Sequence, residues 1–214
     1  MTVETVSGTN GTAAFATGPK RLSILGATGS IGSSTLDLVG RNAADFEIVA
    51  LTAQNNAVAL AALAMKHGAR LAVIGDERRY GELKDALAGS GIRVAAGAEA
   101  LVAAAAEPAD CVMAAIIGAA GLAPTFEAAR QGRRLALANK ECLVSGGAVF
   151  MSEVARHGTE LLPVDSEHSA AFQALAGSPP DTIERIVLTA SGGPFRTWSE
   201  AQLAAATPEQ ALKH

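Results

Sequence analysis

The sequence RLSILGATGSIG at residues 21–32 decides the fold of this chain. Its first five residues form an apolar run typical of a buried strand, and Ser30 to Val39 has the pattern of a helix. Glycines at Gly26, Gly29 and Gly32 stand where this strand would turn into the helix, so the backbone can turn tightly and a pyrophosphate can approach closely. The free N–H groups and the dipole of a helix start favour phosphate. The stretch predicts a dinucleotide site; a structural turn without phosphate is the alternative.

The composition is that of a globular protein of 214 residues. Hydrophobic residues make up 49% and charged residues 18%, so the chain can bury a core. A net charge of −4 gives no general attraction to nucleic acid, and no uncharged apolar run is long enough to predict a membrane span. Cys111 and Cys142 lie in apolar surroundings and indicate buried thiols in a reducing compartment, so we expect a cytoplasmic protein. Residues 1–20 are expected to form a disordered leader.

Short apolar runs alternate with helix-length segments, which predicts an α/β fold with a doubly wound, mostly parallel, Rossmann-like sheet. The expected strands cover residues 21–25, 46–52, 71–74, 93–95, 111–117, 134–138, 160–164 and 183–188. The expected helices include residues 30–39, 57–67, 122–130 and 146–156, and one that Asp76 caps and that runs towards Ala88. The pattern of apolar runs and helical segments changes near residue 150. We therefore expect a cofactor domain over 21–150 and the first part of an α+β catalytic domain over 151–214.

The last residues have the pattern of a helix start. Thr207-Pro208-Glu209-Gln210 combines a capping residue, a proline at the first helical position and a glutamine three residues after the cap. A single helical turn is not stable alone, and the sequence stops at His214. We expect the chain to stop short of its domain end; a frayed tail is the alternative.

Asp165 and Glu167 are two positions apart in the sequence. In an extended segment their side chains would point to the same face, and carboxylate oxygens suit Mg²⁺ or Mn²⁺. A solvated loop with two ordinary acids is the alternative on spacing alone.

Polar residues also follow two predicted strands. Asn139-Lys140-Glu141 comes after residues 134–138, at a strand end where ligands of an open α/β sheet gather. Lys140 would reach a phosphate or a polarised carbonyl there, or would be an ordinary surface lysine. Ser191-Gly192-Gly193-Pro194 comes after residues 183–188, and its glycines suit either a flap over a substrate or a plain connection.

The end of the second predicted strand bears on the identity of the cofactor. An NAD site usually carries an acidic residue there, which binds the ribose 2′-OH. This chain has Gln54-Asn55-Asn56 instead, so a 2′-phosphate is not repelled, and no Arg or Lys attracts it. NADP is favoured on this ground.

Five segments together resemble the 1-deoxy-D-xylulose 5-phosphate reductoisomerase family. They occur in the family's order and are LGATGSIG at 25–32, MAAIIGAAGL at 113–122, ANKE at 138–141, LLPVDSEH at 161–168 and ASGGPF at 190–195. The resemblance implies an NADPH-dependent enzyme of non-mevalonate isoprene biosynthesis. Such an enzyme rearranges 1-deoxy-D-xylulose 5-phosphate and reduces the product to 2-C-methyl-D-erythritol 4-phosphate.

The resemblance also implies residue roles by matching positions. The cofactor residues would be Thr28, Gly29, Ser30, Ile31, Asn139 and Glu141. Gln54, Asn55 and Asn56 are further cofactor candidates because of their place after the second predicted strand. Mg²⁺, Mn²⁺ or Co²⁺ would bind Asp165 and Glu167. The substrate, a small phosphorylated sugar, would contact Lys140, Ser166, Glu167, Ser191 and His214, of which Lys140, Glu167 and His214 are the expected catalytic residues. The full-length enzyme is expected to be a homodimer with no nucleic-acid or membrane partner.

The chain departs from the family in two places. The family usually carries a lysine or arginine where this chain has Gln54-Asn55-Asn56, so a cation expected beside the cofactor is missing. The family's flap tryptophan, phosphate site and third metal-ligating glutamate follow the position of His214, and Trp198 lies too early to be that tryptophan. We therefore expect the full-length parent to be active and these 214 residues alone to be inactive.

Two other functions fit part of the sequence. A semialdehyde dehydrogenase opens with a similar glycine turn and would need Cys142 as a reactive nucleophile. A nucleotide-binding remnant would bind NADPH without catalysis and would bind metal weakly.

Overall fold

The structure is a computed structural model that describes residues 18–187 and 193–213. It divides into two compact units, of which the first ends at Pro163 and the second begins at Val164. The domain boundary expected near residue 150 falls inside helix α7 (Gly147–His157), which packs on α5 (Leu122–Arg130) of the first unit.

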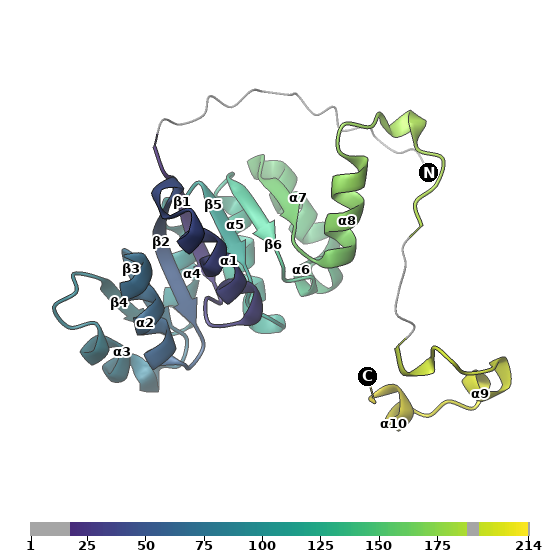
Figure 1. The fold of residues 1–214 in the computed structure, drawn as a ribbon, viewed down its shortest axis with the longest axis horizontal. Coiled ribbons are helices and arrows are strands. Elements are labelled where there is room, and N and C mark those ends of the chain that lie inside the picture. Colours follow the sequence, from purple (N-terminus) through teal and green to yellow (C-terminus); the bar gives the residue numbers. More distant parts are fainter. Residues whose placement is uncertain (1–17, 188–192, 214) are drawn as a thin grey trace. The chain divides into compact units, whose positions relative to one another are not determined.

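The first unit is built around a parallel sheet whose seven strands lie within the described residues (Figure 1). In chain order these strands are β1 (Lys20–Leu25), β2 (Phe46–Ala53), β3 (Leu71–Ile74), β4 (Arg93–Ala96), β5 (Cys111–Ala114), β6 (Arg134–Leu137) and β7 (Glu160–Pro163). Their order in the sheet is β4-β3-β2-β1-β5-β6-β7. The order reverses between β1 and β5, as in a doubly wound fold. The predicted α/β class is confirmed, although β5 ends at Ala114, short of the predicted residue 117.

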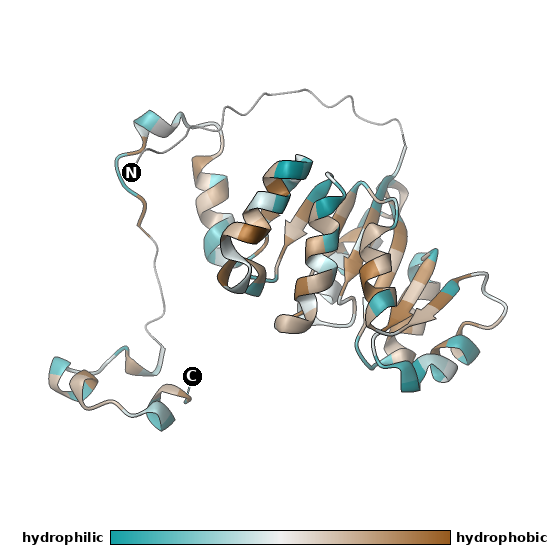
Figure 2. Cartoon of the chain, turned by 180° about the vertical axis from the view of Figure 1, so that it is seen from behind, coloured by the Kyte–Doolittle hydropathy of each residue, from teal (hydrophilic) through white to brown (hydrophobic). Residues whose placement is uncertain are grey.

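Helices cover both faces of this sheet (Figure 1). One face carries α1 (Ser30–Arg41), α2 (Ala57–His67) and α3 (Tyr80–Ala86). The other carries α4 (Ala98–Ala106), α5, α6 (Glu141–Ser145) and α7. Strand residues alternate between the two cores, so that Ile24 packs on the first face and Leu25 on the second. Figure 2 shows hydrophobic residues concentrated along the strands, as expected for a sheet buried on both faces.

The short 3₁₀ helices of the first unit are Ala43–Asp45, Glu77–Arg79 and Ala119–Gly121. Asp76 caps the second of them by accepting a hydrogen bond from the backbone N–H of Arg78, and α3 follows directly. The predicted cap at Asp76 is therefore confirmed for the 3₁₀ turn, whereas α3 itself begins at Tyr80 after Arg79 and ends at Ala86, short of the predicted Ala88.

Two glycines of residues 26–32 are required by the fold itself. Gly26 has a φ of +90°, and a Cβ there would stand 2.6 Å from the carbonyl oxygen of Ala115, beyond β5. A Cβ on Gly32 would stand 2.3 Å from the oxygen of Gly26 and 2.6 Å from the Cα of Ala27. All three distances are far below van der Waals contact. Gly26 can therefore approach Ala115, and α1 can pack onto the end of β1, only because these residues lack side chains.

The second unit contains α8 (Ser166–Leu175), α9 (Glu200–Ala204) and α10 (Pro208–Ala211), with 3₁₀ turns at Pro180–Thr182 and Gly193–Phe195. The helix start predicted at Thr207 is confirmed, because its side chain and that of Gln210 form a capping box. The strand predicted over residues 183–188 is wrong for residues 183–187, which have no regular structure; Leu188 lies outside the described residues. A strand needs a neighbouring strand for its N–H and C=O groups, and the described part of this unit contains none.

No helix within the described residues is both long enough and apolar enough to cross a membrane.

Two glycines of α1 give a matched stability test. Gly32→Ala forces the helix away from β1, so we expect the free energy of unfolding to fall by about 1–3 kcal/mol. Gly40 is exposed, and a Cβ there meets only the ring of His67 at 3.5 Å. Gly40→Ala should therefore be neutral or stabilising by up to about 1 kcal/mol, because alanine favours helix. Urea unfolding measures both changes, and equal effects of the two substitutions would contradict the packing described for α1.

Candidate dinucleotide-binding site

A cleft of about 290 Å³ lies at the carboxyl ends of β1, β2 and β5. Its walls come from the turn after β1, the end of β2, the loop after β5 and one residue of α4. They comprise Gly26, Thr28, Gly29, Thr52, Ala53, Gln54, Leu101, Ala115, Ile116, Ile117 and Ala120. The cleft thus occupies the point where the strand order reverses, which is where open α/β sheets bind their ligands.

The glycine turn presents the start of α1 to this cleft. The N–H of Gly29 donates to the oxygen of Gly26 at 3.2 Å, which closes the turn. The N–H of Ser33 donates to the oxygen of Gly29 at 2.8 Å, so the N–H groups of Ser30, Ile31 and Gly32 precede the helical hydrogen bonds. Thr28 and Gly29 line the cleft, whereas Ser30 and Ile31 are exposed at the helix start and are outside its lining.

Gly29 differs from the other two glycines of the turn. Its φ of −79° and ψ of 172° suit any residue, and a Cβ there would meet one atom, the oxygen of Gly26 at an ordinary 3.4 Å. It is the N-cap of α1, a position where serine or asparagine stabilises a helix at least as well. The folded chain therefore gives no reason for glycine at this position of the cleft wall.

The three residues after β2 have separate roles. Gln54 lines the cleft, and its backbone oxygen accepts a hydrogen bond from the N–H of Asp76 at 2.7 Å. Asn55 is exposed, and its carbonyl accepts from Ala57 at 3.2 Å. The side-chain oxygen of Asn56 accepts from the N–H of Ala59 at 3.0 Å and so caps α2. Of the three predicted cofactor residues, only Gln54 lines the cleft.

Asn139 supports the cleft wall from the neighbouring strand. Its side chain is 1% exposed, and its Nδ2 donates to the carbonyl of Ile116 at 2.6 Å and to that of Gly118 at 3.2 Å. Space for this amide exists because residue 121 is glycine, where a Cβ would stand 2.0 Å from Nδ2. The Oδ1 atom is buried and has no hydrogen-bond partner within the described residues. Asn139 therefore fixes the loop after β5 and retains one unused acceptor.

Lys140 and Glu141 begin α6, directly after Asn139. Lys140 is exposed and Glu141 is half-buried, and both are outside the cleft lining. β6 and β7 are neighbours in parallel register, so the carboxyl ends of these strands lie at one edge of the sheet.

Two features of the cleft were not anticipated from the sequence. Thr52 is fully buried, and its hydroxyl oxygen accepts a hydrogen bond from the N–H of Gly26 at 3.0 Å. The signal was available, because Thr52 is the one polar residue in the run 48–53 of β2. The apolar wall was also missed: Ile117 is 81% exposed at the cleft although it is a large aliphatic residue.

The predicted metal ligands lie at the start of α8 in the second unit. Asp165 is its N-cap, and its carboxylate lies 3.2 Å from Nδ1 of His168; Glu167 accepts a hydrogen bond from the hydroxyl of Ser166 at 2.7 Å. The extended geometry expected for residues 165–167 is wrong, because α8 begins at Ser166 and its dipole favours the acidic Glu167 in the first turn. The described residues contain no group of three His, Cys, Asp or Glu side chains that would hold a metal ion.

Two predicted substrate residues, Ser191 and His214, lie outside the described residues.

Both cysteines are free thiols. Cys142 is fully buried, and burial raises the pKa of its thiol, although a hydrogen bond with Thr125 lowers it. Burial also raises the pKa of Cys111. A nucleophilic cysteine needs a lowered pKa and access to a substrate, so Cys142 lacks what a semialdehyde dehydrogenase requires.

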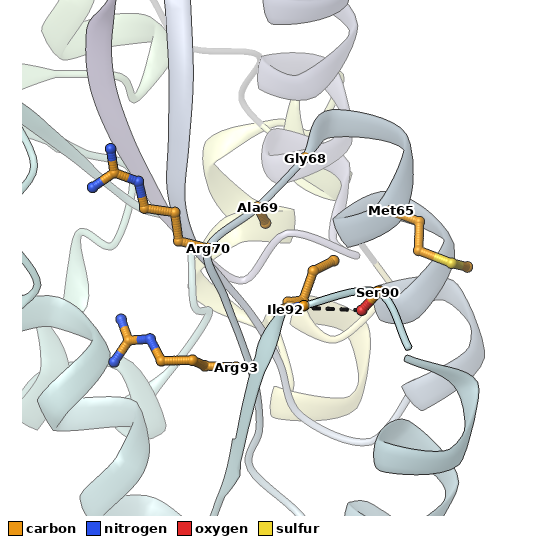
Figure 3. Close-up of a pocket in the computed structure, with 8 residues that line it drawn as sticks. Met65, Gly68, Ala69, Arg70, Ser90, Ile92 and Arg93 are labelled. Atoms are coloured by element: carbon orange, nitrogen blue, oxygen red, sulfur yellow. Dashed lines mark hydrogen bonds between the residues drawn. The ribbon is translucent and has the colours of Figure 1, made fainter. Parts of the chain in front are cut away.

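A larger cavity of about 530 Å³ lies at the amino ends of β3 and β4, the opposite end of the strands from the cleft (Figure 3). Its polar side chains are engaged. Ser90 accepts from the N–H of Ile92 at 3.2 Å, and Arg70 and Arg93 pair with Glu47 and Glu107. In Figure 3 both guanidinium groups extend away from Met65 and Ser90. The size of this cavity is therefore not sufficient to identify it as the dinucleotide-binding site.

A family model described as 1-deoxy-D-xylulose 5-phosphate reductoisomerase matches residues 22–147, and a model of that enzyme's C-terminal domain matches residues 161–214. The chain belongs to the 1-deoxy-D-xylulose 5-phosphate reductoisomerase family. The resemblance found in the sequence is thereby confirmed. The family member of Rhizobium rhizogenes is 59% identical over 199 residues, which cover 91% of this chain and 50% of that protein.

Solved structures of the family resemble the chain as well. A complex of the Zymomonas mobilis reductoisomerase with NADPH matches with a TM-score of 0.85 and 54% identity, and covers 92% of this chain and 52% of that one. A reductoisomerase complex with NADPH, fosmidomycin and magnesium matches with a TM-score of 0.74 and 37% identity, and covers 91% and 51%. The chain thus spans about half the length of the relatives it matches.

Asn139 can be tested by a substitution of similar size. Asn139→Leu leaves the carbonyls of Ile116 and Gly118 without their donor in a buried place, so we expect the free energy of unfolding to fall by about 1–3 kcal/mol. Asn42 provides the matched control, because its exposed amide donates to the carbonyl of Leu38 at 3.0 Å and water can replace it. Asn42→Leu should change stability by less than about 0.5 kcal/mol. Thermal unfolding of both variants checks this, and an unchanged Asn139→Leu variant would show that the buried bonds contribute nothing.

Proposed function

We propose that this chain forms the NADPH-binding part of a 1-deoxy-D-xylulose 5-phosphate reductoisomerase, with a divalent-metal and substrate region in its second unit. The reaction proposed for the whole enzyme converts 1-deoxy-D-xylulose 5-phosphate to 2-C-methyl-D-erythritol 4-phosphate. The observation that carries this proposal is Gly29, a cleft residue whose lack of a side chain the folded chain does not require. A bound phosphate close to the backbone supplies the missing reason.

The remaining cleft residues fit a dinucleotide. The N–H groups at the start of α1 would hold the pyrophosphate, with Thr28 beside them. The apolar wall at Ile116 and Ile117 suits a ring of the cofactor, and the buried Oδ1 of Asn139 offers an acceptor that the protein leaves unused. Gln54 would face the ribose end without a charge of either sign, which allows a 2′-phosphate. NADPH and magnesium are named in the related complexes, which supports this choice of cofactors.

The metal and substrate roles rest on the chemistry of the donors. Asp165 and Glu167 offer carboxylate oxygens, and Mg²⁺ is commonly held by one or two carboxylates together with water and substrate oxygens. Bound NADPH would supply the reducing equivalent, and the cation would polarise the substrate's oxygens. Lys140 would contact the substrate's polar end, Ser166 and Glu167 would contact it beside the metal, and Ser191 and His214 would close over it. Glu141 would contact the cofactor.

The proposal extends to the setting of the whole enzyme. We include a cytoplasmic location, which two unpaired thiols support, and a homodimer as its assembly. The substrate is a small phosphorylated sugar, and the related complex with fosmidomycin supports a compact anionic ligand.

Gly29→Ser separates fold from function. Serine is a better N-cap than glycine, so stability should stay within about 1 kcal/mol or rise. Its side chain would enter the cleft and accept from the N–H groups that the phosphate needs, so the Kd for NADPH should increase at least about tenfold, or 1.4 kcal/mol. Fluorescence titration of NADPH measures the Kd, with Gly40→Ala on the same helix as control. Unchanged NADPH affinity in Gly29→Ser would contradict the placement of the pyrophosphate.

Removal of one carboxylate tests the metal site. Asp165→Asn or Glu167→Gln should weaken Mn²⁺ binding at least about tenfold, because each removes a charged oxygen ligand. Glu184→Gln, an exposed acid of the same unit, should leave it unchanged. Electron paramagnetic resonance of free Mn²⁺ gives the affinity. Equal loss in all three variants would mean that the cation follows net charge and has no defined site.

A further inference from the structure

We propose that Thr52 is a positioning residue for the dinucleotide site, because it holds the turn after β1 in the shape that receives a pyrophosphate. The proposal rests on the proposed NADPH function. It assigns a role to a buried side chain of β2 that has no part in the glycine motif itself.

Thr52 binds two successive amides of the turn. Its hydroxyl oxygen accepts from the N–H of Gly26 at 3.0 Å, and its backbone oxygen accepts from the N–H of Ala27 at 2.7 Å. The pairing of β1 with β2 runs only to Ile24 and Leu51, so these two bonds are what continues the link between the strands into the turn. Thr52 itself is fully buried and is paired with Val73 of β3, so its position is fixed by the sheet.

A contact on the opposite side also restricts the backbone of the turn at Gly26. Gly26 is in the left-handed region, and a Cβ on it would stand 2.6 Å from the oxygen of Ala115 on the opposite side. Gly26 in turn accepts from Gly29, whose own oxygen accepts the first helical hydrogen bond of α1. A chain of hydrogen bonds therefore leads from Thr52 through Gly26 and Gly29 to the helix start. The hydroxyl of Thr52 sets the direction of the N–H groups proposed to bind phosphate.

The nature of the side chain also matters. Threonine is branched at Cβ and has few rotamers in a strand, so its hydroxyl is held in one direction before any ligand arrives. Valine has the same shape without the acceptor, and would leave the N–H of Gly26 without its partner. Serine keeps the acceptor and loses one methyl group.

The test compares the affinities of two ligands in hydroxyl-deletion and hydroxyl-retaining variants. Thr52→Val should raise the Kd for NADPH at least about tenfold, whereas Thr52→Ser should stay within about threefold of the unchanged chain. Adenosine 2′-monophosphate has no pyrophosphate, so its Kd should change less than about twofold in either variant. A purely structural role would alter both ligands alike or neither. Thr52→Ala is a second hydroxyl deletion, used if Thr52→Val does not fold, with the same changes expected.

Thr159→Val is the control for a buried threonine away from the cleft. The hydroxyl of Thr159 donates to the carbonyl of Ala129 just before β7, at the amino ends of the strands. This variant should lower the melting temperature and leave the Kd for NADPH unchanged. If the folded Thr52→Val variant binds NADPH as the unchanged chain does, the role of Thr52 is overturned while the proposed function stands. If the chain without any substitution does not bind NADPH, the role of Thr52 and the proposed function are both overturned.

Discussion

Gly26 is held between Thr52 of β2 on one side and the backbone of Ala115, beyond β5, on the other. A methyl group at Gly26 would overlap the Ala115 carbonyl, so the contact exists only with glycine in a left-handed conformation. The central strands meet at this point, and the strand order of the sheet reverses here. The position of α1, the width of the cleft and the direction of its N–H groups all follow from this contact.

The glycine motif combines two requirements that the structure separates. Gly26 and Gly32 are required by backbone contacts within the chain, because a Cβ atom on either residue would overlap neighbouring backbone atoms. Gly29 has an ordinary conformation, and a Cβ on it would make one ordinary contact, with the oxygen of Gly26 at 3.4 Å. The first pair would be needed in any protein that packed a helix so closely on a strand. The third points to a ligand, which is why it carries more functional information than the motif as a whole.

Elements with a strong local pattern could be predicted from the sequence. The strand at residues 71–74 and the helices at 57–67 and 122–130 have the predicted bounds, because their apolar runs and flanking residues are sufficient to define them. The strand predicted at 183–188 had only its apolar run, and the described residues offer it no partner. The spacing of Asp165 and Glu167 fits an extended segment as well as a helix start, so spacing alone did not predict α8.

Contacts between segments that are distant in the sequence could not be predicted from local sequence patterns. Thr52 and Gly26 are 26 positions apart, and Asn139 reaches Ile116 across 23, so neither hydrogen bond has a local signature. Asn139 was predicted as a cofactor residue by its match to the family, and Gln54 by its place after the second strand. In the structure Asn139 also holds the loop after β5, and Asn56, predicted beside Gln54, caps a helix. Such structural roles depend on the sheet order.

We propose that NADPH binds at the carboxyl ends of β1, β2 and β5, and a nuclear magnetic resonance titration of the ¹⁵N-labelled chain with NADPH would locate the binding site. We expect the largest amide shifts at Gly26 to Ile31, at Gln54 and at Ile116 and Ile117, and no shifts at the residues around the larger cavity. Shifts centred on Gly68 to Arg70 and Ser90 to Arg93, or no shifts at saturating NADPH, would contradict it.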